Sequence, residues 1–222
     1  MKAIISFVGV CCLMACASST ACAFSGGADS GETVRERRMQ YRGFMGGMML
    51  HTGYVRSSDL TIISPGGESR TFGVAGMPFG IGGAIRFMFG EHLRIGAEGY
   101  MSDLRYGEYA SHVETGWGGL LADCVWKVGK CRLFVGGTLG GGGQTSTVIL
   151  SPVGEDYLAE EFVSYRKYSF AAFAPFAGAE VPVGGKFAIV FKLDYLLDIS
   201  NPQDDYVKGP RLYIGFMFGH SD

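Results

Sequence analysis

Several apolar stretches of this chain carry charged side chains on one of their two alternating faces. Arg86 and Glu98 lie in two neighbouring stretches, and Lys192 and Asp194 lie in a later one. Charges of both signs in a confined apolar setting are stable only when they pair and form hydrogen bonds. The pattern predicts a polar network that either fills and fixes the interior of the fold or lines a polar path or binding site. Its candidate members are Arg86, Arg94, Glu98, Asp123, Lys127, Arg132, Glu180, Lys192, Asp194 and Arg211.

Two histidines have the neighbours that nucleophilic catalysis requires, namely a hydroxyl close to a base. Thr52 follows His51, and Ser111 precedes His112. Such neighbours are common by chance, so we interpret both histidines as solvated loop residues; a lipid-modifying enzyme is the alternative. The sequence has no catalytic carboxylate pair, phosphate-binding loop or metal-ligand cluster. We therefore expect no enzymatic activity, no cofactor and no metal.

The cysteines outside the N-terminal segment are Cys124 and Cys131. A disulfide between them would persist in an oxidising compartment. A four-residue connection would place Cys124 directly opposite Cys131, within reach of a disulfide. A two-residue turn at Val128-Gly129 would instead place Cys131 opposite Trp126 and prevent the bond. We predict the disulfide, with the tighter turn as the competing register.

Residues 1–23 have the layout of a signal peptide. Lys2 precedes an apolar run from Ala3 to Ala15, and Ala21-Cys22-Ala23 matches an A-x-A cleavage pattern. The run is too short to span a bilayer as a helix. A lipoprotein signal at Cys16 is the alternative. We expect residues 24–39 to form a polar periplasmic leader and residues 40–222 to form the folded domain.

Composition limits the possible partners. The chain has 19 Lys and Arg against 21 Asp and Glu, and because no basic cluster occurs we expect no nucleic-acid partner. Glycine accounts for 36 of the 222 residues, about twice its usual share. No run of 18 or more apolar residues follows the signal segment, which excludes a transmembrane helix.

Beyond residue 40 the chain alternates between apolar and polar or small residues, which is the pattern of β-strands. Short turns are predicted at 90–92, 128–130 and 182–185. Long polar connections are predicted at 56–76, 103–112, 144–166 and 198–209. Strict alternation of short and long connections over about eight strands is typical of outer membrane barrels. We predict an all-β fold, a closed antiparallel up-and-down transmembrane β-barrel with apolar residues outside; the pattern does not assign the faces of the first strand.

In its signal peptide, strand count, loop alternation and apolar outer face, the chain resembles the small eight-stranded outer membrane barrels, the group that contains OmpA, OmpX, OmpW and PagP. It departs from the group at its end, where Phe218 is followed by four further residues. The resemblance implies export to the outer membrane and contact with its lipid. It favours a passive OmpW-like channel or pocket for small hydrophobic solutes. The alternative is a barrel-anchored surface protein whose external loops bind a host or cell-surface ligand.

Overall fold

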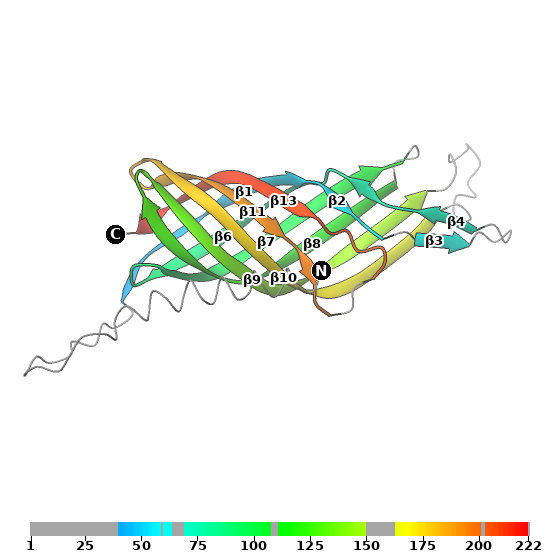
Figure 1. The fold of residues 1–222 in the computed structure, drawn as a ribbon, viewed down its shortest axis with the longest axis horizontal. Coiled ribbons are helices and arrows are strands. Elements are labelled where there is room, and N and C mark those ends of the chain that lie inside the picture. Colours follow the sequence, from blue (N-terminus) through cyan, green and yellow to red (C-terminus); the bar gives the residue numbers. More distant parts are fainter. Residues whose placement is uncertain are drawn as a thin grey trace, which may run out of the picture.

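Eight long antiparallel strands form a closed barrel (Figure 1). The computed structural model describes residues 40–222 except 59, 64–68, 108–110, 150–162, 201–202 and 222, so the predicted signal peptide (1–23) and leader (24–39) lie outside the described residues. The strands are β1 (Tyr41–Gly53), β6 (Phe79–Phe89), β7 (Leu93–Tyr106), β8 (Ser111–Val128), β9 (Cys131–Ile149), β10 (Val163–Gly184), β11 (Phe187–Tyr195) and β13 (Pro210–Ser221). Pairing of β1 with β13 and of β10 with β11 closes the ring. The predicted fold class is confirmed.

The long connections contain more regular structure than the sequence indicated. The first one, predicted as a polar loop at 56–76, contains β2 (Val55–Arg56), β3 (Leu60–Ile63), β4 (Ser69–Phe72) and β5 (Ala75–Gly76). β2 pairs with β5, and β3 pairs with β4. The β-branched residues of β3 favour an extended strand. The short β12 (Leu197–Asp198) pairs with β10. In the part of the chain that the structure describes, no helix is long and apolar enough to cross a membrane.

The three short turns lie at the same end of the barrel, at residues 90–92, 129–130 and 185–186. Each contains a glycine in the left-handed region, with φ of 63° at Gly90, 61° at Gly129 and 55° at Gly185. The third turn comes later than the predicted 182–185, because β10 continues to Gly184 and pairs there with Phe187. We call this end of the barrel the short-turn end and the opposite end the long-loop end.

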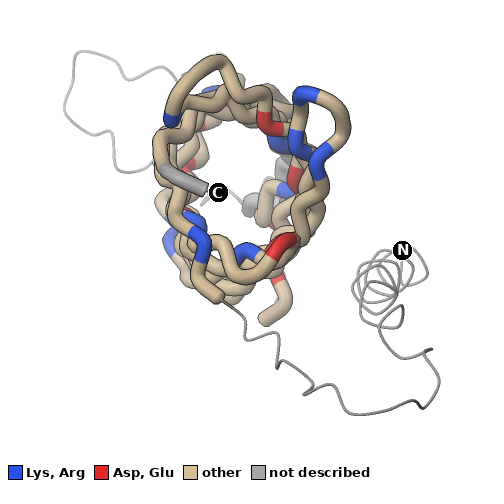
Figure 2. The backbone as a smooth tube through the Cα atoms, turned by 90° about the vertical axis from the view of Figure 1, so that its left-hand side faces the viewer, with Lys and Arg blue, Asp and Glu red and all other residues tan. Residues whose placement is uncertain are grey.

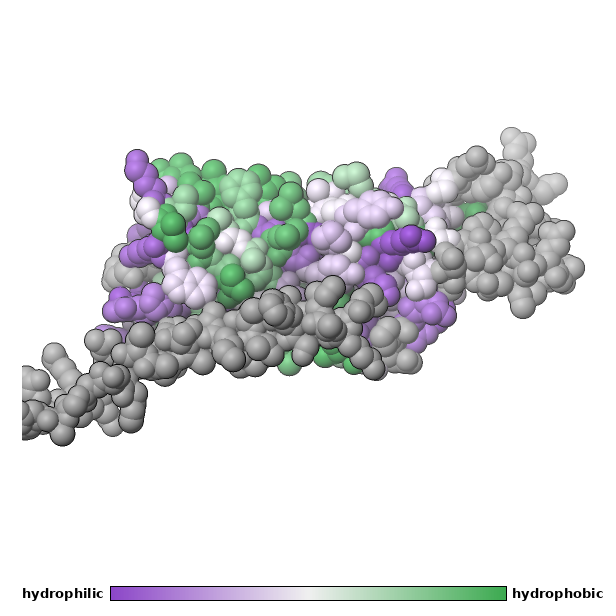
Figure 3. All heavy atoms as spheres, in the orientation of Figure 1, coloured by the Kyte–Doolittle hydropathy of each residue, from purple (hydrophilic) through white to green (hydrophobic). Residues whose placement is uncertain are grey.

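Side chains alternate between the interior and the outer surface along every long strand. In β1, whose faces the sequence left unassigned, Met45 and Met49 are buried inside, whereas Phe44 and Leu50 are exposed outside. Figure 3 shows apolar residues gathered over the half of the barrel nearer the short turns. Large exposed apolar residues of this outer belt include Phe44, Met48, Leu50, Phe79, Ile81, Ile85, Phe87, Ile95, Leu120, Leu133, Leu139, Phe191, Leu193, Leu212, Ile214, Phe216 and Phe218.

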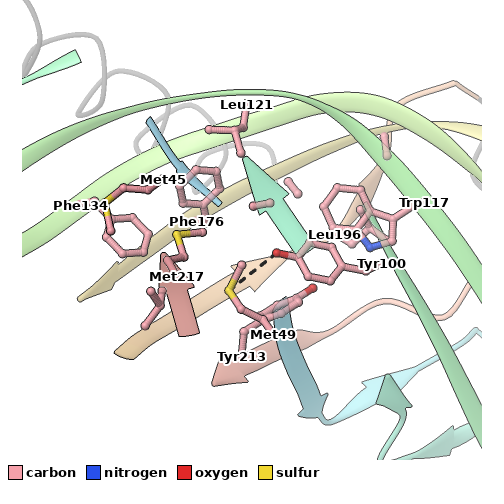
Figure 4. Packing of buried hydrophobic residues seen from close by; sticks show 14 of the residues in the cluster. Met45, Met49, Tyr100, Trp117, Leu121, Phe134, Phe176, Leu196, Tyr213 and Met217 are labelled. Atoms are coloured by element: carbon pink, nitrogen blue, oxygen red, sulfur yellow. Dashed lines mark hydrogen bonds between the residues drawn. The ribbon is translucent and has the colours of Figure 1, made fainter. Parts of the chain in front are cut away.

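Inward-facing glycines make room for aromatic rings in the interior. A Cβ on Gly82 would lie 2.2 Å from Cδ1 of Tyr100, and one on Gly178 would lie 2.3 Å from Cζ of Phe134. Figure 4 shows these two rings within the buried cluster, and Tyr100 donates a hydrogen bond to Sδ of Met49 at 3.9 Å. The glycine content of the chain is therefore partly explained by interior packing.

Replacing Gly82 by valine should lower the free energy of unfolding by about 1–3 kcal/mol or more, because a Cβ there would meet the backbone oxygen of Gly99 as well as the Tyr100 ring, and both must shift. Gly116→Ala is the matched control, since a Cβ there meets only Cγ of Met101 at 3.9 Å. Urea unfolding followed by circular dichroism measures both variants. Equal unfolding midpoints would show that Gly82 is not needed for packing.

Candidate functional site

Four charged residues form a closed ring of ion pairs inside the short-turn half of the barrel. Arg86 of β6 lies 3.4 Å from Asp123 of β8 and 3.1 Å from Glu180 of β10. Arg94 of β7 contacts the same two carboxylates, each at 2.5 Å. The ring of Phe134 on β9 lies 4.6 Å from the Arg86 guanidinium carbon and 5.0 Å from that of Arg94. Five consecutive strands thus meet at this group of Arg86, Arg94, Asp123 and Glu180, which we call the ring cluster.

A second charged group lies nearer the long loops. Nζ of Lys192 contacts the two carboxylate oxygens of Glu98 at 3.0 and 2.9 Å and Oδ2 of Asp194 at 3.4 Å. Glu98 also accepts hydrogen bonds from Thr138 at 2.6 Å and from Tyr100 at 3.2 Å. Arg211 of β13 pairs in register with Asp194 of β11. We call Glu98, Lys192, Asp194 and Arg211 the lysine cluster.

Aromatic rings surround the ammonium group of Lys192. Nζ lies 4.4 Å from the ring centroid of Tyr213, 4.7 Å from that of Tyr100 and 5.0 Å from that of Phe176. An ammonium over aromatic faces is stabilised by their quadrupoles, and more so when it is desolvated. The sequence analysis did not assign these aromatic residues and Thr138 to the network, although they lie on the same inward faces of the strands as the predicted charges.

The two clusters contain four cations and four anions, and none of the eight side chains has more than 5% of its surface exposed. Their formal charges therefore cancel inside the barrel. Two of the ten predicted network residues lie elsewhere. Lys127 is exposed at the short-turn end, and the half-buried Arg132 donates to Sδ of Met45 at 3.7 Å. Both residues have the predicted inward register but lie too close to the turn to reach the clusters.

The predicted location of His51 was wrong. His51 is not a solvated loop residue but lies inside the barrel with 2% of its surface exposed. Its ring centroid is 4.7 Å from that of Tyr213 and 5.6 Å from that of Tyr100. Thr52 follows it on the opposite face of β1, because neighbouring residues of a strand point in opposite directions. The same alternation separates Ser111, which is buried, from His112 on β8.

The predicted disulfide is also wrong, and so are both registers considered for it. The turn consists of Gly129 and Lys130, which pairs Val128 with Cys131 and places Cys124 opposite Val135. Cys124 and Cys131 are not joined by a disulfide. Val135 lies four residues beyond Cys131 on β9, roughly 13 Å along the strand, which is too far for a disulfide without backbone movement.

A segment from residue 203 to 209, which we call the strap, crosses the interior at the long-loop end. On one side, backbone hydrogen bonds join Arg56 and Lys208 at 2.9 and 3.0 Å. On the other side, the Gln144 amide of β9 donates to the backbone oxygen of Asp205 at 2.7 Å and accepts from the backbone nitrogen of Val207 at 3.3 Å. β9 lies four strands away from β1 in the sheet. The strap therefore spans the mouth of the barrel.

Buried side chains of the strap fix it against the barrel wall. Tyr206 points inward, with its ring centroid 5.1 Å from that of Phe170 on β10. The Asp205 carboxylate lies 3.4 Å from Nη1 of Arg166. Burial raises the pKa of Asp205, although Arg166 acts in the opposite direction. Since the charged form is disfavoured here, the carboxylate contributes less to holding the strap than its ion pair alone suggests.

No group of three or more His, Cys, Asp or Glu side chains in the described ranges is arranged to hold a metal ion. The arrangement that the described residues do form is a neutral network that occupies the interior and a strap that crosses its outer mouth. The ion pairs of this network join side chains of different strands and so hold the strands in register.

Comparison with known proteins shows similarity in structure only. No protein-family model and no curated protein matches the chain. The outer membrane protein OprG of Pseudomonas aeruginosa is 14% identical, with 83% of this chain and 99% of that chain covered and a TM-score of 0.52. Ail, the attachment invasion locus protein of Yersinia pestis, solved with the heparin analogue sucrose octasulfate, is 13% identical over 80% of this chain and 99% of that chain, with a TM-score of 0.49. Neisserial surface protein A is 11% identical over 81% and 97%, with a TM-score of 0.45.

The closed eight-strand topology and the match to OprG give this chain the fold of the small eight-stranded outer membrane barrels, as the sequence predicted. The preference for an OmpW-like member of that group stays a prediction.

Replacing Glu180 by glutamine should lower the free energy of unfolding by about 3–5 kcal/mol, because Arg86 and Arg94 both lose a buried partner. The double variant Glu180→Gln with Arg86→Met leaves one balanced pair, Arg94 with Asp123, and should recover part of that loss. Unfolding midpoints in urea measure the three proteins. A double variant less stable than Glu180→Gln would contradict the assigned pairing.

Proposed function

We propose that this protein is an outer membrane barrel that anchors an external β-structure, and that the external part binds a host or cell-surface ligand. The observation that carries the proposal is that the strands on one side extend well beyond the apolar outer belt while the interior is filled and its outer mouth is crossed by the strap.

The outer belt has the dimensions that a bilayer requires. On β6 it runs from Phe79 to Phe89, which is 11 residues, close to the 9–11 residues of a tilted membrane-spanning strand. Exposed aromatic residues lie at its edges, as in membrane interfaces. At the short-turn end, the ring centroids of Phe187 and Phe218 are 5.1 Å apart, and those of Phe216 and Phe218 are 5.3 Å apart. These features support insertion in a membrane, and the fold supports the outer membrane as its location.

The external part is formed by the ends of the longest strands. β8, β9 and β10 have 18, 19 and 22 residues, whereas β11 has 9. Above the belt their outward residues include charged ones, for example Glu114 on β8 and Lys167 on β10, and Figure 3 shows this part of the surface as mostly white and purple. The external part has its own apolar core, which consists of Val55, Val74, Leu104, Val113 and Val207. It is therefore a folded structure and not a set of irregular loops.

The interior offers little support for free passage. Both charged clusters are buried, ion pairs join most of their members, and the strap is held at both sides of the mouth. Opening a path would separate buried ion pairs, which is costly. The passive channel or pocket for small solutes is therefore our second candidate.

One observation favours that second candidate. In the long-loop half, both ring nitrogens of His51 and Nε1 of Trp117 have no hydrogen-bond partner among the described residues. Buried polar atoms normally have partners, so these atoms would suit a small solute with hydroxyl groups better than a hydrophobic one.

Membrane insertion is tested by Phe191→Arg, which places a cation on the outer belt. The change should prevent folding into lipid vesicles, because a cation at the bilayer midplane costs about 2–4 kcal/mol. Thr145→Arg is the control, since this residue lies on the polar outer surface of the external part and should fold normally. Heat-modifiable gel mobility measures folding. Equal folding of both variants would contradict the assigned belt.

Shortening the first long connection distinguishes the proposed ligand-binding function from the channel function. Replacing residues 58–73 by Asn-Gly keeps the contact between Ser57 and Val74 and removes the β3–β4 hairpin. Cells that carry this variant should lose attachment to immobilised host extracellular macromolecules and retain a folded barrel, and the control Glu91→Ala should change neither property. The wild-type protein should give no stepwise conductance in planar bilayers. Conductance steps together with unchanged attachment would favour the channel.

A further inference from the structure

The two ends of the barrel differ in charge. Among the described residues, the short-turn end has five basic side chains and one acidic one. The basic residues are Arg42, Lys127, Lys130, Arg132 and Lys186, and the acidic residue is Glu91. At the long-loop end, the residues whose side chains are described are balanced, with five bases and five acids. They are Arg56, Arg105, Arg166, Lys167 and Lys208 against Asp103, Glu114, Asp198, Asp204 and Asp205. Figure 2 views the barrel from the short-turn end, where basic residues lie around the rim.

These basic residues lie directly beyond the apolar belt. Lys127 and Lys130 flank Val128, which is 55% exposed, and Lys186 precedes Phe187. Arg42 follows Tyr41, whose ring packs edge-on against Phe89 with centroids 6.1 Å apart. Because aromatic residues mark the interface of a membrane, the cations next to them lie at the level of the lipid headgroups. Lys127 has an inward register but is exposed at the rim, and long Lys and Arg side chains can reach from the rim into that layer.

Among the described residues, few acidic groups neutralise this rim. Arg42 lies 4.0 Å from Glu91, and both side chains are well exposed to solvent. Lys127, Lys130 and Lys186 are exposed and have no ion-pair partner among the described residues. Exposed cations next to a membrane attract anionic lipids and gain from their concentration in one place.

We infer that the short-turn rim binds the phosphate groups of anionic phospholipids in the leaflet that faces the periplasm. Lysine suits this partner, because an ammonium on a flexible chain contacts phosphate as a point charge from many directions. Each lysine near an anionic membrane contributes about fivefold in affinity, so the three lysines together account for a preference on the order of tenfold to hundredfold. The inference rests on the proposed insertion in a membrane. It adds to that proposal a lipid class and an orientation.

Trp126 provides a probe at the site itself. It lies on the outer face of β8 next to Lys127, whereas the second tryptophan of the chain, Trp117, is buried inside with 5% of its surface exposed. In a Trp117→Phe background, brominated phospholipid quenches the fluorescence of Trp126 according to which lipid lies beside it. The protein is refolded into phosphatidylcholine–phosphatidylglycerol vesicles in which one lipid or the other is brominated.

Brominated phosphatidylglycerol should quench Trp126 more than brominated phosphatidylcholine at equal mole fraction, and 0.5 M salt (roughly three times physiological ionic strength) should reduce the difference. The variant Lys127→Gln, Lys130→Gln, Lys186→Gln should abolish the preference. The matched control Arg56→Gln, Arg105→Gln, Lys167→Gln, at the long-loop end, should keep it. Heat-modifiable mobility confirms that each variant is folded.

Equal quenching of the wild-type protein by both brominated lipids would overturn the inference, whatever the variants do. Quenching by neither lipid would instead contradict the proposed insertion in a membrane. Salt-sensitive binding to isolated peptidoglycan that the three lysine changes remove, without any lipid preference, would assign the rim to a cell-wall partner and also overturn the inference.

Discussion

Four cations and four anions lie inside this barrel, and the register of the surrounding strands depends on keeping them together. Arg86 and Arg94 bind the same two carboxylates from neighbouring strands, while Glu180 comes from the far side of the ring. A shift of one strand by one residue would move its charges to the outer belt and its apolar residues to the interior. Each misplaced charge would leave a buried partner behind. The ion pairs thus penalise wrong registers more strongly than they stabilise the right one.

The narrowness of the barrel makes this arrangement possible. An eight-stranded barrel has an interior only wide enough for side chains, so long residues fit where a facing position is glycine. Gly82 and Gly178 allow Tyr100 and Phe134 to lie across the interior, and these rings separate and cover the charged groups. The aromatic rings around Lys192 replace part of the hydration that its ammonium loses. The packing of the interior therefore depends on glycine, aromatic and charged residues together.

The sequence predicted which side chains face inward, because alternation is a local property of a strand. Arg86, Glu98 and Lys192 were assigned to the interior by that rule alone, and the structure places them there. Pairing between strands depends on the turn, and a turn shifted by one residue placed Cys131 opposite Val128 and not opposite Cys124 or Trp126.

Two other features were not predictable from local pattern. β1 has methionine and glycine on both faces, so only its partners reveal that Met45 and Met49 point inward. The strap depends on contacts between residues far apart in sequence, such as Gln144 and Val207, and nothing in the polar composition of residues 203–209 indicates that they turn inward.

The position of the strap in the chain has a consequence for biogenesis. The strap lies between β12 and β13, and β13 is the strand that pairs with β1 to complete the ring. Its anchors on β2 and on β9 lie on opposite sides of the mouth, so the strap reaches both of them once the sheet has curled into a ring. Until then the charged interior stays open to water, where unpaired groups are hydrated at little cost. Closure of the seam and placement of the strap are thus coupled, and the buried ion pairs leave bulk water only when the ring is complete.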